Sequence, residues 1–145
     1  MNPLVLLLAV PVIGAIVCAI LPRADSARRW ALFVSLMTAG LAVVLLAIFN
    51  FRPATGGYPQ FEFGPEHEGS WLSVPAIGFS FQLGIDAVSL WLVLLTALLM
   101  PLSVAASAPA IRQRQKEYYA WMLALLAAML GVFVARDVLL FYVFF

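Results

Sequence analysis

Long apolar runs separated by shorter polar stretches dominate the pattern of side chains along the chain. About 20 apolar residues of helix cross the roughly 30 Å hydrocarbon core of a bilayer, so a run of that length predicts a transmembrane helix. Proline and glycine inside such a run are tolerated, because neighbouring helices can satisfy the freed backbone groups. Four runs qualify, at about residues 4–21, 29–49, 86–107 and 118–135.

A fifth apolar segment begins at Val138 and continues to Phe145. At about 1.5 Å per residue it would span only about 12 Å, too short to cross a bilayer. We therefore expect residues 1–145 to be the N-terminal part of one transmembrane bundle domain in a longer chain. The expected fold class is an all-α integral membrane protein, a polytopic bundle of four complete helices and the start of a fifth.

The longest polar segment, residues 50–85, alternates apolar and polar side chains in two places. The alternation covers residues 58–63 and 79–83, and glycines and prolines bound both stretches. A period of two bounded by such residues predicts strand–turn–strand structure. We expect a small extracytoplasmic hairpin lying on the outer surface of the bundle.

Basic residues divide unevenly between the connections. The second connection and the short turn before the fifth segment hold two, Arg52 and Arg136. Because Lys and Arg are enriched in cytoplasmic loops, the N-terminus is predicted to be extracytoplasmic and the first and third connections cytoplasmic. Those two connections hold six basic residues: Arg23, Arg28, Arg29, Arg112, Arg114 and Lys116.

Composition agrees with a membrane protein and excludes other classes. Apolar residues form 65% of the chain and charged residues 10%, whereas soluble domains have roughly 45–50% and about 25%. The net charge is only +1, so no basic field indicates nucleic acid as a partner. The start, Met1-Asn2-Pro3, lacks the basic side chain of a signal peptide, which favours a retained first helix.

Ionisable side chains are absent from the interior of the four predicted helices, so no proton relay, ion site or redox ligand is expected there. No glycine-rich phosphate loop, metal-spaced His/Cys set or nucleophile–base pair is present either. Asp86 opens the third helix and Asp137 the fifth, and both are predicted N-caps, with a proton-conducting or partner-contacting role as the alternative. Asp25 or Ser26 is expected to cap the second helix.

Several other side chains have a simple structural interpretation beside a functional one. Cys18, the only cysteine, is expected to be a small packed side chain. His67 lies between two glutamates but lacks further metal ligands at a suitable spacing, which favours a solvated loop histidine. Tyr118, Tyr119 and Trp121 fit anchoring at the membrane interface better than a quinone site.

Three stretches in this order resemble the antiporter-like membrane subunits of NADH:quinone oxidoreductase, respiratory complex I. Gly84-Ile-Asp-Ala-Val-Ser-Leu90 resembles the start of that family's third helix, and Lys116-Glu-Tyr-Tyr119 the start of its fourth. Residues 129–145 resemble the passage from its fourth helix into its fifth. Ala87 stands where the family usually has Gly. The nearest branch is the subunit M family of bacteria, equivalent to mitochondrial subunit 4.

The resemblance implies a subunit that moves protons across the bacterial plasma membrane, coupled to quinone reduction elsewhere in the complex. It implies no cofactor on this chain; FMN, iron–sulfur clusters and quinone would belong to the whole complex. The implied partners are other membrane subunits and the lipid bilayer. The family's proton path uses a glutamate directly after the aromatic run that reaches Phe145, and lysines in later helices. No catalytic, cofactor-binding or metal-binding residue is therefore assigned among residues 1–145.

Two alternatives remain open from the sequence. A subunit of a multisubunit cation/proton antiporter, or a membrane-bound hydrogenase relative, would share the same helices. A small membrane scaffold or assembly protein is the alternative from another class.

Overall fold

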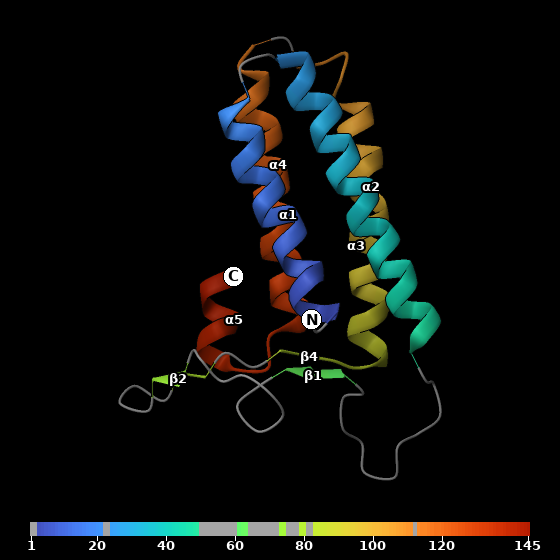
Figure 1. Ribbon diagram of the computed structural model, residues 1–145, viewed down its shortest axis with the longest axis vertical. Coiled ribbons are helices and arrows are strands. Elements are labelled where there is room, and N and C mark those ends of the chain that lie inside the picture. Colours follow the sequence, from blue (N-terminus) through green and yellow to red (C-terminus); the bar gives the residue numbers. More distant parts are fainter. Residues whose placement is uncertain are drawn as a thin grey trace.

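The described part of the chain consists mainly of helices (Figure 1). The computed structural model describes residues 3–21, 24–49, 61–63, 73–74, 79–80, 83–111 and 113–145. The helices are α1 (Pro3–Ile20), α2 (Ala24–Ile48), α3 (Ala87–Ala106), α4 (Gln115–Val134) and α5 (Val138–Phe144).

Helices α1 to α4 are each long and apolar enough to cross a membrane, which confirms the predicted fold class. They stand side by side, with α1 packed mainly on α4 and α2, and α2 packed on α3 (Figure 1). The α1–α2 and α3–α4 connections lie at one end of the bundle. The chain start, the strands and the α4–α5 turn lie at the other end (Figure 1).

Four short strands lie within the segment between α2 and α3: β1 (Phe61–Phe63), β2 (Ser73–Val74), β3 (Phe79–Ser80) and β4 (Leu83–Ile85). The sequence predicted one hairpin, whereas the described residues of this segment form two antiparallel pairs, β1 with β4 and β2 with β3. Residues 58–60 and 81–82 of the predicted strands lie outside the described residues. The β1–β4 pair crosses the strand-bearing end of the bundle (Figure 1). There β4 is buried, and Leu83 also forms an isolated antiparallel bridge with Ala135.

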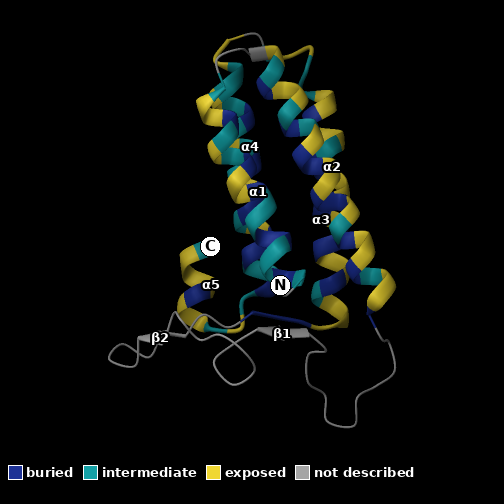
Figure 2. Ribbon diagram, viewed as in Figure 1, coloured by how far each residue is buried: buried dark blue, intermediate teal, exposed yellow. Residues whose placement is uncertain are grey.

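The core is formed by one buried face of each long helix, as Figure 2 shows. On α4 the buried side chains recur every three or four residues, which is the period of a single helix face. They include Tyr119, Leu123, Leu126, Leu130 and Val134. The opposite faces are apolar as well: Ile20 is 76% exposed and Leu102 66% exposed. Lipid or further helices must cover these faces, because water would not support so much apolar surface.

Helix α2 begins earlier than the sequence indicated. It starts at Ala24, so Asp25 lies in its first turn and is not the N-cap, and Ser26 is also helical. Arg28 and Arg29 therefore belong to the helix and not to a loop. An acidic side chain in the first turn is favourable because it faces the positive end of the helix dipole. The charged residues of α2 therefore lie at the start of the helix, before its apolar stretch.

Helices α1 and α2 approach closely at Gly14. A Cβ atom at this position would lie 2.5 Å from a methyl group of Val34. One turn earlier on α2, the indole nitrogen of Trp30 donates a hydrogen bond to the Gly14 carbonyl oxygen, at 3.2 Å. Small residues at helix–helix contacts in membranes permit such close packing. Gly40 offers a contrast, because nothing lies within 4 Å of its hypothetical Cβ.

Helix α3 starts directly from β4, and Asp86 forms the junction. Its backbone is extended, with φ −105° and ψ 178°. Its carboxylate accepts a hydrogen bond from the Ser89 amide at 2.7 Å. This satisfies one of the amides that have no partner within the helix, as expected of an N-cap.

Replacing Gly14 with Ala should destabilise the full-length protein, by about 1–3 kcal/mol, because the new methyl group overlaps Val34. The matched substitution Gly40→Ala meets open space and should be neutral or slightly stabilising, since Ala favours helix. Thermal unfolding in detergent would measure both changes. Equal effects of the two substitutions would contradict the close approach of α1 and α2.

Replacing Asp86 with Ala should weaken the first turn of α3 by about 1 kcal/mol, whereas Asp86→Asn should retain most of the cap. Hydrogen–deuterium exchange should show faster exchange of residues 87–90 in Asp86→Ala and little change elsewhere in α3. Unchanged exchange at these positions would show that the carboxylate does not stabilise the helix start.

Candidate functional site

Charged residues are confined to the ends of the described helices. In α2 none lies beyond Arg29, and in α4 none lies beyond Glu117. Helices α1 and α3 contain none at all. The expectation of a bundle interior without charged groups thus holds for the spans that the structure describes. Chemistry that requires a charged group must therefore use the two ends of this bundle or helices outside it.

The two ends carry opposite charge. By sequence, the end with the α1–α2 and α3–α4 connections holds six basic and two acidic residues. The other end holds two basic and five acidic residues. The fold thus matches the charge separation predicted from the sequence. It brings the first and third connections to one end of the bundle and the second and fourth to the other. Which end faces the cytoplasm stays a prediction from the positive-inside rule.

Asp86 is suited to be a fixed hydrogen-bond acceptor. Hydrogen bonds from the Ser89 side chain and the Ser89 amide lower the pKa of its carboxyl group, against a smaller effect of burial. It is consequently ionised throughout the neutral range. A proton relay works best with a pKa near the working pH, so this geometry favours the cap. A further role of Asp86 in proton conduction or partner contact stays a prediction.

Asp137 marks the start of α5 in the same way. Its carboxylate accepts a hydrogen bond from the Leu139 amide at 2.9 Å. The turn before it is held by the Leu83–Ala135 bridge. Strand β4 thus contacts the segment that starts α5 and, through Asp86, also leads into α3. This strand fixes the starts of two helices that are far apart in the sequence.

Helix α5 is placed by its contact with α4. Leu140 is buried, and the ring of Phe144 lies so close to Gly131 that a Cβ there would be 2.5 Å from it. The sequence alone does not indicate which side chain occupies the space beside Gly131. Tyr142 and Val143 face outward, 68% and 73% exposed.

The aromatic residues at the start of α4 do not form a single group. Tyr119 is 1% exposed and belongs to the core, which corrects its expected role as an interface anchor. The reason is its register, since it begins the buried face of α4. Tyr118 is partly buried and packs edge-on against Tyr119, with ring centroids 5.4 Å apart. Trp121 is 74% exposed, as an anchor requires.

Cys18 and His67 are the remaining candidates from the sequence. Cys18 is buried, as predicted, and its thiol donates to the Ala27 carbonyl at 3.7 Å. The Lys116 carbonyl lies 4.0 Å from the same sulfur, so Cys18 packs where α1, α2 and α4 meet. His67 lies outside the described residues. Among the residues that are described, no group of three His, Cys, Asp or Glu could hold a metal ion.

Comparison with known proteins links these features to one family. Residues 70–133 match the family model described as NADH-ubiquinone oxidoreductase chain 4, amino terminus. NADH-quinone oxidoreductase subunit M of Rhodobacter capsulatus is 37% identical over 99% of this chain and 27% of the relative.

Similar proteins occur in other organisms as well. NADH-ubiquinone oxidoreductase chain 4 of Arabidopsis thaliana is 35% identical over 96% of this chain and 27% of its own length. F(420)H(2) dehydrogenase subunit M of Methanosarcina mazei is 33% identical over 96% of this chain and 26% of its own length. The chain thus spans about a quarter of the length of these relatives. Together with the four spanning helices, these matches show that the chain belongs to the NADH-quinone oxidoreductase subunit M and chain 4 family of membrane proteins.

Proposed function

We propose that this chain supplies the first helices of a proton-translocating membrane subunit of an NADH:quinone oxidoreductase in the bacterial plasma membrane. The observation that carries the proposal is the similarity to subunit M over nearly the whole chain. The N-terminus would lie outside the cytoplasm, as the basic residues indicate. The partners would be the other membrane subunits of the complex and the lipid bilayer.

In this proposal α1 to α4 act as a scaffold. Their charged groups lie at the helix ends, so the residues that carry protons through the middle of the membrane would lie in α5 and later helices. The position that follows Phe145 is nine residues after the Asp137 cap. If α5 continues, that position lies about 13 Å along the helix, close to the middle of a hydrocarbon core roughly 30 Å thick. The glutamate that the family resemblance places there would then be deeply buried.

A buried carboxylate can couple to proton movement through its pKa. Desolvation raises the pKa of the carboxyl group, and an approaching lysine lowers it. A conformational change that separates or rejoins the pair would therefore load or release a proton. The docking of α5 on Gly131, together with the bridge between β4 and the turn before α5, would fix the depth and direction of this carboxylate.

Redox chemistry would occur on other subunits. Relatives of comparable identity are named for different electron donors, NADH in one case and F(420)H(2) in another. This supports a shared role for the matched helices that does not depend on the donor. FMN, iron–sulfur clusters and quinone would then be bound elsewhere in the complex. Co-purification with flavin and iron–sulfur subunits would separate this assignment from a cation/proton antiporter.

The first prediction concerns the continuation of the chain. Mass spectrometry of the native protein, with peptide sequencing across Phe145, should find a chain several times longer, with Glu as the next residue. A native mass near 15.8 kDa would instead favour a small scaffold protein.

The second prediction concerns that glutamate in the full-length protein. Replacing it with Gln should abolish redox-driven acidification of proteoliposomes by the assembled complex, because Gln cannot carry the proton. Replacing it with Asp should retain part of the activity. Normal pumping by the Gln variant would refute the proposed role.

The contact between Gly131 and Phe144 that positions α5 can be tested by substitution. Gly131→Ala should displace Phe144 and lower proton pumping severalfold while the complex still assembles, because the new methyl group overlaps the ring. The double variant Gly131→Ala/Phe144→Leu removes the overlap and should recover much of the activity. Measuring pumping per assembled complex would separate displacement of α5 from loss of protein. Failure of the second substitution to restore activity would argue against this contact as the positioning device.

A further inference from the structure

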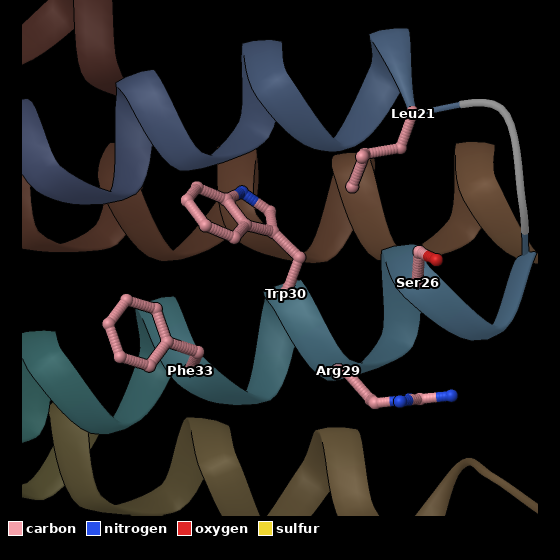
Figure 3. A pocket seen from close by; sticks show the side chains of 5 residues that line it. All are labelled: Leu21, Ser26, Arg29, Trp30 and Phe33. Carbon is pink, nitrogen blue, oxygen red and sulfur yellow. The ribbon is translucent and has the colours of Figure 1, made fainter.

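A pocket of about 430 Å³ opens between the end of α1 and the first turns of α2 (Figure 3). Leu21 lines it from the α1 side, and the side chains from α2 are Ser26, Arg29, Trp30 and Phe33. It therefore lies at the basic end of the bundle, where the candidate membrane span of α1 ends and that of α2 begins.

The lining changes from polar to apolar along α2. Ser26 and Arg29 lie at its N-terminal end, and Figure 3 shows the guanidinium of Arg29 extending toward that end. Trp30 and Phe33 follow toward the middle of the helix, with ring centroids 5.8 Å apart. The hydrogen bond from Trp30 to Gly14 holds the indole between the helices, so the apolar wall has a defined shape. A polar mouth thus leads into an apolar wall in the direction of the bilayer interior.

The apolar wall continues along the same face of α2. Residues spaced by three, four or seven positions share a helix face, and Met37, Gly40 and Val44 continue the row from Phe33. Met37 is 47% exposed and Val44 55% exposed. Gly40 leaves open space between them, since nothing lies within 4 Å of its hypothetical Cβ. The result is an apolar track with a depression in it, leading inward from the pocket.

The charge at the mouth is available for a ligand. Among the described residues, no carboxylate lies within ion-pair distance of Arg29; the ion pair at this end joins Arg114 and Glu117. The excess of basic residues at this end adds to the field of Arg29, whereas Asp25 in the first turn of α2 offsets part of the positive helix dipole. An anionic group at the mouth would therefore meet a hydrogen-bond donor, a hydroxyl group and a positive potential.

We propose that this pocket binds an anionic phospholipid, with its phosphate at Ser26 and Arg29 and one acyl chain along Trp30, Phe33 and the track beyond. The order of the lining matches the order of a phospholipid, charged at the membrane surface and apolar below it. A free phosphate would make no use of the apolar wall, and an apolar helix would leave Arg29 without a counter-charge. The proposal does not depend on proton pumping by the whole protein.

Photo-crosslinking of the full-length subunit in its complex tests the site. Phe33 is replaced by p-benzoylphenylalanine, and the complex is reconstituted in vesicles with equal amounts of phosphatidylglycerol and phosphatidylcholine of the same acyl chains. After irradiation, mass spectrometry identifies what is joined to position 33. Phosphatidylglycerol adducts should exceed phosphatidylcholine adducts by about fivefold, the effect expected of one basic side chain near the membrane surface.

Three variants separate the pocket from the general charge of this end. Arg29→Gln should bring the adduct ratio close to one. Arg28→Gln makes the same change of charge at a neighbouring exposed position of α2 that does not line the pocket and should leave the ratio unchanged. Ser26→Leu fills the polar mouth without altering charge and should also abolish the preference, which keeps the test decisive if Arg29→Gln does not assemble.

Several outcomes would overturn the proposal. A ratio near one in the parent protein would mean that the pocket does not select an anionic headgroup. An equal decrease in Arg28→Gln and Arg29→Gln would assign the preference to the charge of the whole surface. A preference that survives Ser26→Leu would place the headgroup elsewhere. Crosslinking of position 33 to protein would show that another helix or subunit covers the pocket.

Discussion

The hydrocarbon interior of a membrane offers no hydrogen-bond partners, so every peptide group that crosses it must be paired within the protein. Helices α1 to α4 meet this requirement through their own backbones. Side chains with fixed charge are then excluded from the spans unless a partner offsets their burial. In this chain the charged residues of the four helices all lie in the first two turns of α2 and α4. The caps of α3 and α5, the strands and the basic pocket consequently lie at the ends of the bundle.

Within the membrane, close packing of complementary helix surfaces holds the helices together. Lipid chains are as apolar as leucine, so helix association depends on close packing and a few polar contacts. Gly14 against Val34 and Gly131 against Phe144 are two such close contacts. Both occur where one helix must be placed accurately, α2 beside the pocket and α5 at the start of the proposed proton path. The scaffold thus determines where functional groups lie although it carries none of them in its interior.

The sequence predicted the helices well because length and apolar character are local properties. It also predicted the caps Asp86 and Asp137, since Asp directly before an apolar helix is a preferred N-cap residue. It failed where the outcome depends on register or on a distant partner. Tyr119 was assigned to the interface because its neighbours suit that place, but helical phase turns it into the core. The start of α2 was set too late because Arg28 and Arg29 look like loop residues.

The candidate sites were harder to predict for the same reason. Arg29 and Trp30 each have an ordinary local interpretation. Arg29 suits a basic residue that sets the orientation in the membrane, and Trp30 suits an aromatic anchor at the membrane interface. Only the close approach of α1 at Gly14 makes them the mouth and the apolar wall of one pocket. The contact between Gly131 and Phe144 likewise joins two helices, and neither residue alone indicates it.

The bridge between Leu83 and Ala135 has a consequence for the order in which the protein is made. The two residues meet only after α3 has crossed the membrane and α4 has returned. Until then the edge of β4 that pairs with Ala135 in the folded protein has no partner there. Closure of the bridge would therefore mark the completion of this helical hairpin during biosynthesis. Helix α5 would enter the membrane from a turn that is already anchored, and not from a loose end.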